Sequence, residues 1–190
     1  MEQTNERLKG IRVAILATDG FEQAELVDPR KALDEAGAKT SVISPKRGKI
    51  QGMKHDEKAN SVNVDLTFDE ANPNDFDAVL LPGGALNADA LRMVEPARNF
   101  IRKIDSHRKP IAVICHGPWL LVSSGLTFER TLTSYFTIQD DIRNSGGVWV
   151  DQEVVQDRNW ISSRKPDDIP AFNQKILAVF GEAKAHAKGA

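Results

Sequence analysis

The chain of 190 residues has a single cysteine, Cys115. One cysteine cannot form an internal disulfide or a cysteine-based zinc cage, which excludes disulfide-stapled secreted scaffolds and zinc ribbons. No apolar run approaches the roughly 18 residues that a membrane-spanning helix needs. Residues 1–10 lack the apolar core of a signal peptide, so we expect a cytoplasmic protein that does not bind membranes.

An excess of charge of either sign is also missing. The 25 Lys and Arg residues face 27 Asp and Glu residues, which gives a net charge of -2. Domains dedicated to nucleic acids usually carry a basic excess, so the composition argues against a nucleic-acid partner. The hydrophobic share of 41% and the charged share of 27% are ordinary for a globular protein and exclude extensive disorder.

Short apolar runs alternate with segments of helical periodicity along most of the chain. The expected strands are 11–17, 40–44, 61–66, 77–81, 110–114 and 131–135, with a hairpin over 148–163. The expected helices are 22–36, 88–104, 119–124 and 137–144, with a last one from about 168. This alternation predicts an α/β fold, a three-layer sandwich of the flavodoxin-like type, whose mostly parallel sheet has helices on both faces.

The expected organisation is a single domain over residues 11–180. Residues 1–10 are expected to form an N-terminal extension, and the small, polar residues 181–190 a disordered tail. The polar, glycine-bearing stretch 47–60 is interpreted as a loop. Pro29 predicts a kink in the first helix or a helix that starts near it.

Cys115 lies where an apolar strand meets a helix start that contains glycine and proline. This arrangement resembles a nucleophile elbow, the tight turn that exposes a reactive side chain above a sheet. Backbone N–H groups at a helix start stabilise a thiolate, so we predict a depressed pKa for Cys115. The alternative is a buried structural cysteine, because free cysteines are among the most buried residues.

Gly83 and Gly84 follow another apolar strand. The carboxyl ends of parallel strands are where ligands gather, so these glycines and Cys115 are expected at one edge of the sheet. The glycine N–H groups could hold an oxyanion, although most Gly-Gly pairs only form tight turns. His116, next to Cys115, is the candidate proton carrier.

The sequence motifs around these residues, LLPGG at 80–84 and AVICHGP at 112–118, resemble the PfpI/ThiJ family of the class I glutamine-amidotransferase-like superfamily. Further matching segments are 21–25 with Pro29, 64–68, 76–78, 133–135, 149–155 and 162–168. The likeness covers residues 11 to about 180. Relatives of the PfpI branch are described as intracellular cysteine peptidases, general stress proteins, glyoxalases and deglycases.

The resemblance implies roles for individual residues. Cys115 matches the family nucleophile and His116 its neighbour, while Glu25 matches a buried acid that contacts the cysteine sulfur. Gly84 matches an oxyanion-hole amide, with the His116 backbone as its partner. Tyr135 matches a pocket tyrosine of the branch.

The resemblance also implies a homodimer or a higher homo-oligomer, because the PfpI branch places an acid from a neighbouring subunit against the histidine. Asp89 fills that position if one residue is inserted within 85–88, and without the insertion the position is Ala88. Trp119 is a departure, since relatives often carry glutamine there, and this puts the shape of the pocket in doubt.

Several of these residues also have ordinary interpretations. Glu25 could be a solvated helix glutamate, Asp89 could merely favour the start of its helix, and Tyr135 could belong to the core. His55, beside Asp56 and Glu57, is interpreted as part of a solvated loop and not as a metal ligand. The remaining histidines, His107 and His186, are interpreted as surface residues, so no metal and no cofactor is predicted.

Two functions remain open from the sequence. One is a cysteine-nucleophile hydrolase or lyase of the stress response, acting on methylglyoxal-type carbonyls, on their adducts or on peptides. The alternative is a stress protein that senses oxidants through oxidation of Cys115 without ordinary turnover. Amidotransfer requires a downstream His-x-Glu, and the only later histidine, His186, is followed by Ala187 and Lys188.

Overall fold

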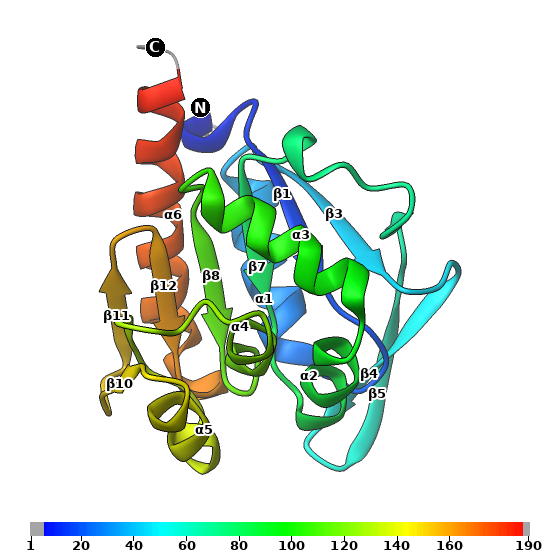
Figure 1. Ribbon diagram of the computed structural model, residues 1–190. Coiled ribbons are helices and arrows are strands. Elements are labelled where there is room, and N and C mark those ends of the chain that lie inside the picture. The colour runs from blue at the N-terminus through cyan, green and yellow to red at the C-terminus, as the bar shows by residue number, and fades with distance from the viewer. Residues whose placement is uncertain (1–5, 188–190) are drawn as a thin grey trace.

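A computed structural model describes residues 6–187 and shows a seven-stranded sheet between two layers of helices (Figure 1). From one edge to the other, the strands are β11 (Val154–Asp157), β12 (Trp160–Ser163), β8 (Ile111–Ile114), β7 (Ala78–Leu81), β1 (Arg12–Leu16), β3 (Lys39–Ser44) and β6 (Leu66–Thr67). β11 is antiparallel to β12, and the other neighbouring strands are parallel. The predicted fold class is confirmed.

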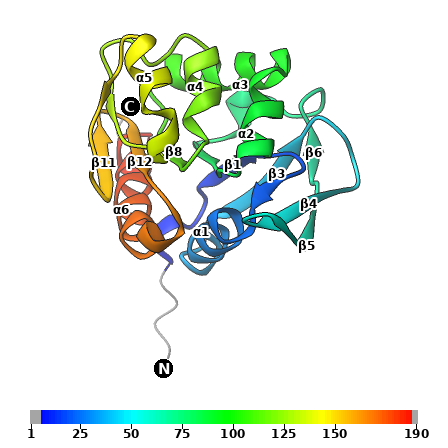
Figure 2. The same cartoon turned by 90° about the horizontal axis from the view of Figure 1, so that it is seen from below.

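The two faces of the sheet are covered by different helices (Figure 2). One layer consists of α1 (Gln23–Glu35) and α6 (Ile169–Ala187), and the other of α2 (Ala85–Arg92), α3 (Glu95–Ser106), α4 (Pro118–Ser123) and α5 (Gln139–Asn144). Four short 3-10 turns are η1 (Glu6–Leu8), η2 (Pro73–Asp75), η3 (Phe136–Ile138) and η4 (Pro166–Asp168). Side chains along a strand alternate between the two faces of the sheet, so the core has two parts. In β1, Val13 and Ile15 pack on the side of α1 and α6, while Ala14 and Leu16 pack on the other side.

Two smaller sheets lie beside the main one. The strands β2 (Phe21–Glu22), β4 (Lys49–Lys54) and β5 (Glu57–Asn63) form the first, and β9 (Thr131–Leu132) with β10 (Val148–Trp149) form the second. The interpretation of 47–60 as a loop is therefore wrong, because β4 and β5 pair as an antiparallel hairpin. Ile50 and Gly52 are buried on one side of this hairpin, and that short pattern was hidden among polar residues.

The helix predicted over 88–104 is two helices, α2 and α3, which meet at Met93 and Val94. Pro96 lies in the first turn of α3, where proline favours a helix start and disfavours a helical residue before it. In contrast, α1 continues through Pro29, which is buried inside the helix. The predicted hairpin over 148–163 is confined to β11 and β12.

The predicted disordered tail differs from the structure in its first part. At the other end, Leu8 of the predicted N-terminal extension is fully buried in the core. The helix α6 continues to Ala187, so 181–187 do not form a frayed tail, and residues 1–5 and 188–190 lie outside the described part. Among the helices of residues 6–187, none is long and apolar enough to cross a membrane.

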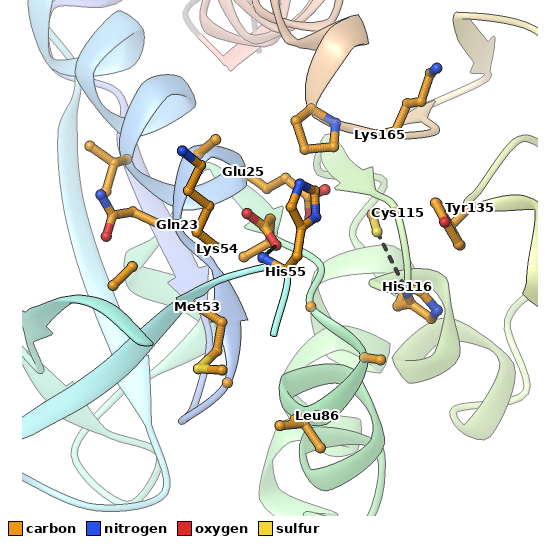
Figure 3. Close-up of a pocket in the computed structure, with 18 of the residues that line it drawn as sticks. Gln23, Glu25, Met53, Lys54, His55, Leu86, Cys115, His116, Tyr135 and Lys165 are labelled. Atoms are coloured by element: carbon orange, nitrogen blue, oxygen red, sulfur yellow. Dashed lines mark hydrogen bonds between the residues drawn. The ribbon is translucent and has the colours of Figure 1, made fainter. Parts of the chain in front are cut away.

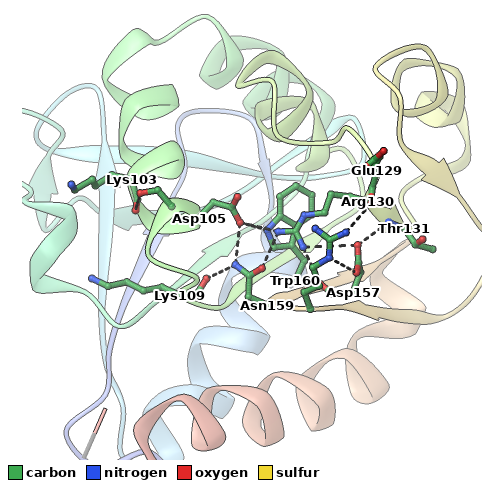
Figure 4. A network of polar contacts seen from close by, with 11 residues as sticks. Lys103, Asp105, Lys109, Glu129, Arg130, Thr131, Asp157, Asn159 and Trp160 are labelled. Atoms are coloured by element: carbon green, nitrogen blue, oxygen red, sulfur yellow. Dashed lines mark hydrogen bonds and ion pairs between the residues drawn. The ribbon is translucent and has the colours of Figure 1, made fainter. Parts of the chain in front are cut away.

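A buried polar network ties α3 to the start of β12 (Figure 4). The guanidinium of Arg130 donates to Asp105 and to Asn159, each at 2.9 Å, and lies 4.0 Å from the centre of the Trp160 ring. The Trp160 indole N–H also donates to Asp105, at 2.7 Å. Since Trp160 begins β12, this network lies at the amino ends of the parallel strands, opposite the edge that carries Cys115.

Candidate active site

Cys115 occupies a strained turn between β8 and α4. Its φ of 62° is in the left-handed region, and its backbone is held by two hydrogen bonds. The Cys115 N–H donates to the Ser163 carbonyl at 3.1 Å, and the Tyr135 N–H donates to the Cys115 carbonyl at 2.9 Å. A side chain at Gly117 would approach the Leu81 carbonyl to 2.8 Å, so only glycine fits this sharp turn. The expected nucleophile elbow is present.

Gly83 and Gly84 bring the end of β7 against the elbow. The backbone N–H groups of Gly84 and His116 both donate toward the Cys115 sulfur. Gly84 has a φ of 88°, and a Cβ atom at Gly83 would overlap the Glu25 carboxyl and lie 2.5 Å from the Cys115 Cβ. The arrangement therefore has two converging amide donors, the geometry that an oxyanion requires.

Glu25 projects from α1 into the same space and is fully buried. Its Oε2 accepts a hydrogen bond from the Gly83 N–H at 2.9 Å, and the carboxyl also interacts with the Cys115 sulfur. Burial is the main cause that raises the pKa of Glu25 to about 8, which the contacts with Cys115 and Gly83 partly oppose. The interpretation of Glu25 as a solvated glutamate is wrong, and this carboxyl holds its proton at neutral pH.

Cys115 is 7% exposed, and its pKa is affected by burial first and by Glu25 second. Both raise the pKa of Cys115 well above its ordinary value, although the amides of Gly84 and His116 oppose them. The predicted depression of this pKa is therefore wrong. Because two negative charges repel strongly in this buried space, Glu25 and Cys115 titrate as a pair that carries one negative charge before it carries two.

His116 faces the thiol with one ring nitrogen. Its Nδ1 lies 3.2 Å from the Cys115 Sγ, so neighbouring side chains at this turn do meet (Figure 3). The ring is stacked on Tyr135, with centroids 5.0 Å apart, and meets Trp119 edge-on at 5.2 Å. Burial lowers the pKa of His116, which favours the neutral imidazole. Tyr135 is half-buried and lines the site instead of the core alone.

A cavity of about 830 Å³ opens above Cys115. Glu25 lies on one side of it and His116 with Tyr135 on the other (Figure 3), and its lining also includes Gly84 and two segments distant in the sequence. These missed segments are the hairpin tip Met53–His55 and the turn Lys165–Asp167. Their approach depends on how the β4–β5 hairpin and η4 fold over the sheet edge, which no local pattern in the sequence reveals.

His55 lies in a solvent-exposed turn, as the sequence predicts, and it also lines the cavity, which the sequence did not indicate. It is exposed at the hairpin tip with a φ of 57°, and its N–H donates to the Glu22 carboxylate at 3.0 Å. His107 is exposed as predicted, and the side chain of His186 lies outside the described part. Within the described residues, no group of three or more His, Cys, Asp or Glu side chains is placed to hold a metal ion.

Asp89 does not join the site within its own chain. It is exposed on α2 and is not among the residues that line the cavity, whereas Ala88 is buried. An acid placed against His116 at this position would have to come from another subunit. Trp119 donates its indole N–H to Asp141 at 3.0 Å and packs beside His116, so it shapes the surroundings of the histidine.

Residues 11–179 match the DJ-1/PfpI family. The chain is 45% identical over 167 residues to Deglycase TK1284 of Thermococcus kodakarensis, covering 88% of this chain and 98% of that protein. It is 40% identical over 172 residues to General stress protein 18 of Bacillus subtilis, covering 90% and 98%.

The crystal structure of Drosophila melanogaster DJ-1beta is similar in fold, with a TM-score of 0.81 at 27% identity. The match covers 94% of this chain and 96% of that one. The family match, the close relatives and the elbow cysteine agree with the predicted resemblance. The chain belongs to the DJ-1/PfpI family.

Proposed function

We propose that this protein is a cysteine-dependent deglycase that acts on the adducts which methylglyoxal-type dicarbonyls form with amino and guanidino groups. The observation that carries the proposal is the convergence of the Cys115 sulfur, the His116 ring and two backbone amides at one point of a cavity. Relatives named as deglycases, at 45% identity for Deglycase TK1284, support the same substrate class.

The first chemical step is attack of the Cys115 thiolate on an electrophilic carbon of the bound adduct. The oxygen that gains negative charge lies toward the N–H groups of Gly84 and His116. The neutral ring of His116 lies against the sulfur, so it can take the thiol proton and return it to the leaving group, whereas Glu25, protonated at neutral pH, can act only as a proton donor. A positioned proton carrier of this kind contributes roughly 10² to 10⁴-fold to a rate.

The size of the cavity favours an adduct over free methylglyoxal. Pockets of about 300–1,000 Å³ hold drug-sized molecules, and this one is about 830 Å³. Its lining carries Lys54 on the β4–β5 hairpin, Asp28 on α1, and Lys165, which forms an ion pair with Asp167 at 3.0 Å, so it offers charged partners to an amino acid or short peptide. The reactive carbonyl part would then lie at the bottom, beside Cys115.

The proposal is tested with a panel of three substrates: free methylglyoxal, methylglyoxal-modified amino acids and a fluorescent peptide library. Each is incubated with the wild-type protein and with Cys115→Ala, and product formation is followed over time. We expect cysteine-dependent turnover of the modified amino acids. Cleavage of unmodified peptides instead would identify a peptidase, and turnover that persists in Cys115→Ala would contradict the proposal.

A redox function is favoured by one specific observation. The protonated Glu25 faces the sulfur of Cys115, and its Oε1 is buried without a nitrogen or oxygen partner. A sulfinate at Cys115 would accept a hydrogen bond from that carboxyl. Peroxide titration followed by intact mass separates the functions, since Glu25→Gln should still hold the sulfinic form and Glu25→Ala should not, whatever their turnover.

We also propose that the protein forms a homodimer or a higher homo-oligomer through α2. Leu86 and Met93 are 67% and 72% exposed, and with Asp89 they follow the helical period on one side of this helix. Leu86 also lines the cavity, and an exposed apolar pair of this kind suits an interface between copies of the chain. Asp89 would then lie near the boundary between subunits.

A further inference from the structure

The imidazole of His116 has a contact at each of its two ring nitrogens. Nδ1 lies 3.2 Å from the Cys115 Sγ, and Nε2 lies 3.3 Å from the Thr137 Oγ1. The stacked Tyr135 and the edge-on Trp119 fix the plane of the ring between these contacts. A neutral imidazole has one proton for two nitrogens, so the neighbours decide which nitrogen carries it.

The chemistry of each neighbour sets that choice. A thiol at Cys115 donates to Nδ1, and the proton of His116 is then on Nε2. A thiolate only accepts, so Nδ1 must carry the proton and Nε2 becomes an acceptor. A hydroxyl can accept from Nε2 in the first state and donate to it in the second, whereas a carboxylate in the same place could only accept.

We propose that Thr137 is a positioning residue that allows neutral His116 to change tautomer as Cys115 gains or loses its proton. On ionisation, the Sγ proton moves to Nδ1 and the Nε2 proton moves to the Thr137 oxygen. The original hydroxyl proton leaves to water, so one proton is lost in total. Thr137 is exposed in η3, which gives this hydroxyl access to solvent.

Burial lowers the pKa of His116, in agreement with a ring that stays neutral throughout. Other titratable side chains line the same cavity and are common to every variant below. They are Glu22, Glu25 and Asp28 near α1, Lys54 and His55 on the hairpin, Tyr135, and Lys165 and Asp167 at η4. The catalytic meaning of the inference rests on the proposed function, but its test does not require turnover.

The test compares Thr137→Val, which removes the hydroxyl at nearly constant shape, with Thr137→Ser, which keeps it. Thr131→Val, on β9 and away from the cavity lining, is the matched control. The rate of Cys115 alkylation by iodoacetamide is measured from about pH 6 to about pH 11, a range that extends above the ordinary thiol pKa because the pKa of Cys115 is raised, and the ring ¹⁵N shifts of His116 report its tautomer. We expect Thr137→Val to move the alkylation midpoint upward by about one pH unit, a tenfold slower reaction at neutral pH.

In the same experiment, Thr137→Ser and Thr131→Val should keep the wild-type dependence of the alkylation rate on pH. In these variants the His116 proton should move from Nε2 to Nδ1 as the pH rises, and only Thr137→Val should lose this change of tautomer. Wild-type alkylation and ¹⁵N shifts in Thr137→Val would overturn the inference. So would a profile that moves in Asp89→Asn but not in Thr137→Val, because a partner subunit would then control His116. If no substrate is turned over while Thr137→Val moves the profile, the proposed function fails and this inference stands.

Discussion

Replacing Glu25 with glutamine should remove a pH dependence from the stability of the fold. The folded protein keeps the Glu25 proton up to a pKa of about 8, whereas the unfolded chain releases it near the ordinary glutamate pKa of about 4.5. The folded state therefore binds more protons between these values, and the free energy of unfolding falls as the pH rises through this window. Because a tenfold change in the protonation equilibrium is worth about 1.4 kcal/mol, the free energy of unfolding falls by at most about 5 kcal/mol between the two pKa values.

The assay is urea unfolding of the wild type and Glu25→Gln at intervals from pH 4.5 to 8.5. Glutamine still accepts a hydrogen bond from the Gly83 N–H but cannot ionise. The two proteins should therefore have similar free energies of unfolding at acidic pH, and Glu25→Gln should become the more stable one as the pH rises. Glu35→Gln, an exposed carboxylate on the same helix, controls for the loss of one charge. If the free energies of unfolding of the wild type and Glu25→Gln changed in parallel with pH, Glu25 would not be a buried carboxyl that is protonated at neutral pH.

Three further variants test other parts of the structure. Gly83→Ala should destabilise the fold by more than about 2 kcal/mol in urea unfolding, because its Cβ would overlap the Glu25 carboxyl, and an unchanged midpoint would argue against the packing at the β7 end. Arg130→Ala should cost about 3–5 kcal/mol since it leaves Asp105 without its cation, whereas the exposed Arg158→Ala should cost under about 0.5 kcal/mol. Sedimentation should show a species larger than the 21.0 kDa chain, and Leu86→Asp should dissociate it. If the wild type sediments only as a 21.0 kDa species at micromolar concentration, the proposed role of Asp89 is wrong.

The sheet and the elbow could be predicted because their signals are local. The run of apolar residues ending at Ile114 is interrupted at once by Cys115 and Gly117, and this pattern identifies a buried strand followed by a sharp turn. The end of β7 at Gly83 could be placed beside it, since parallel strands end at the same edge of a sheet. The structure brings these residues together as expected.

What sequence reasoning missed depends on tertiary packing. Glu25 resembles any helix glutamate until α1 is docked on the sheet, and its burial then raises its pKa and reverses the expected effect on Cys115. His55 reaches the cavity only because its hairpin pairs with β2 near the start of α1. Thr137 gave no signal at all, because its contact with His116 joins residues 21 positions apart.

Removal of a methylglyoxal adduct by Cys115 is the proposed reaction. The direct measurement is the initial rate at which methylglyoxal-modified N-acetylarginine returns to N-acetylarginine, with aminoguanidine present to trap free methylglyoxal. Spontaneous reversal is then the same in every sample. The wild type should exceed that background by at least about 100-fold, and Cys115→Ser should match it. Equal rates in the wild type and Cys115→Ser, both at the background, would contradict the account.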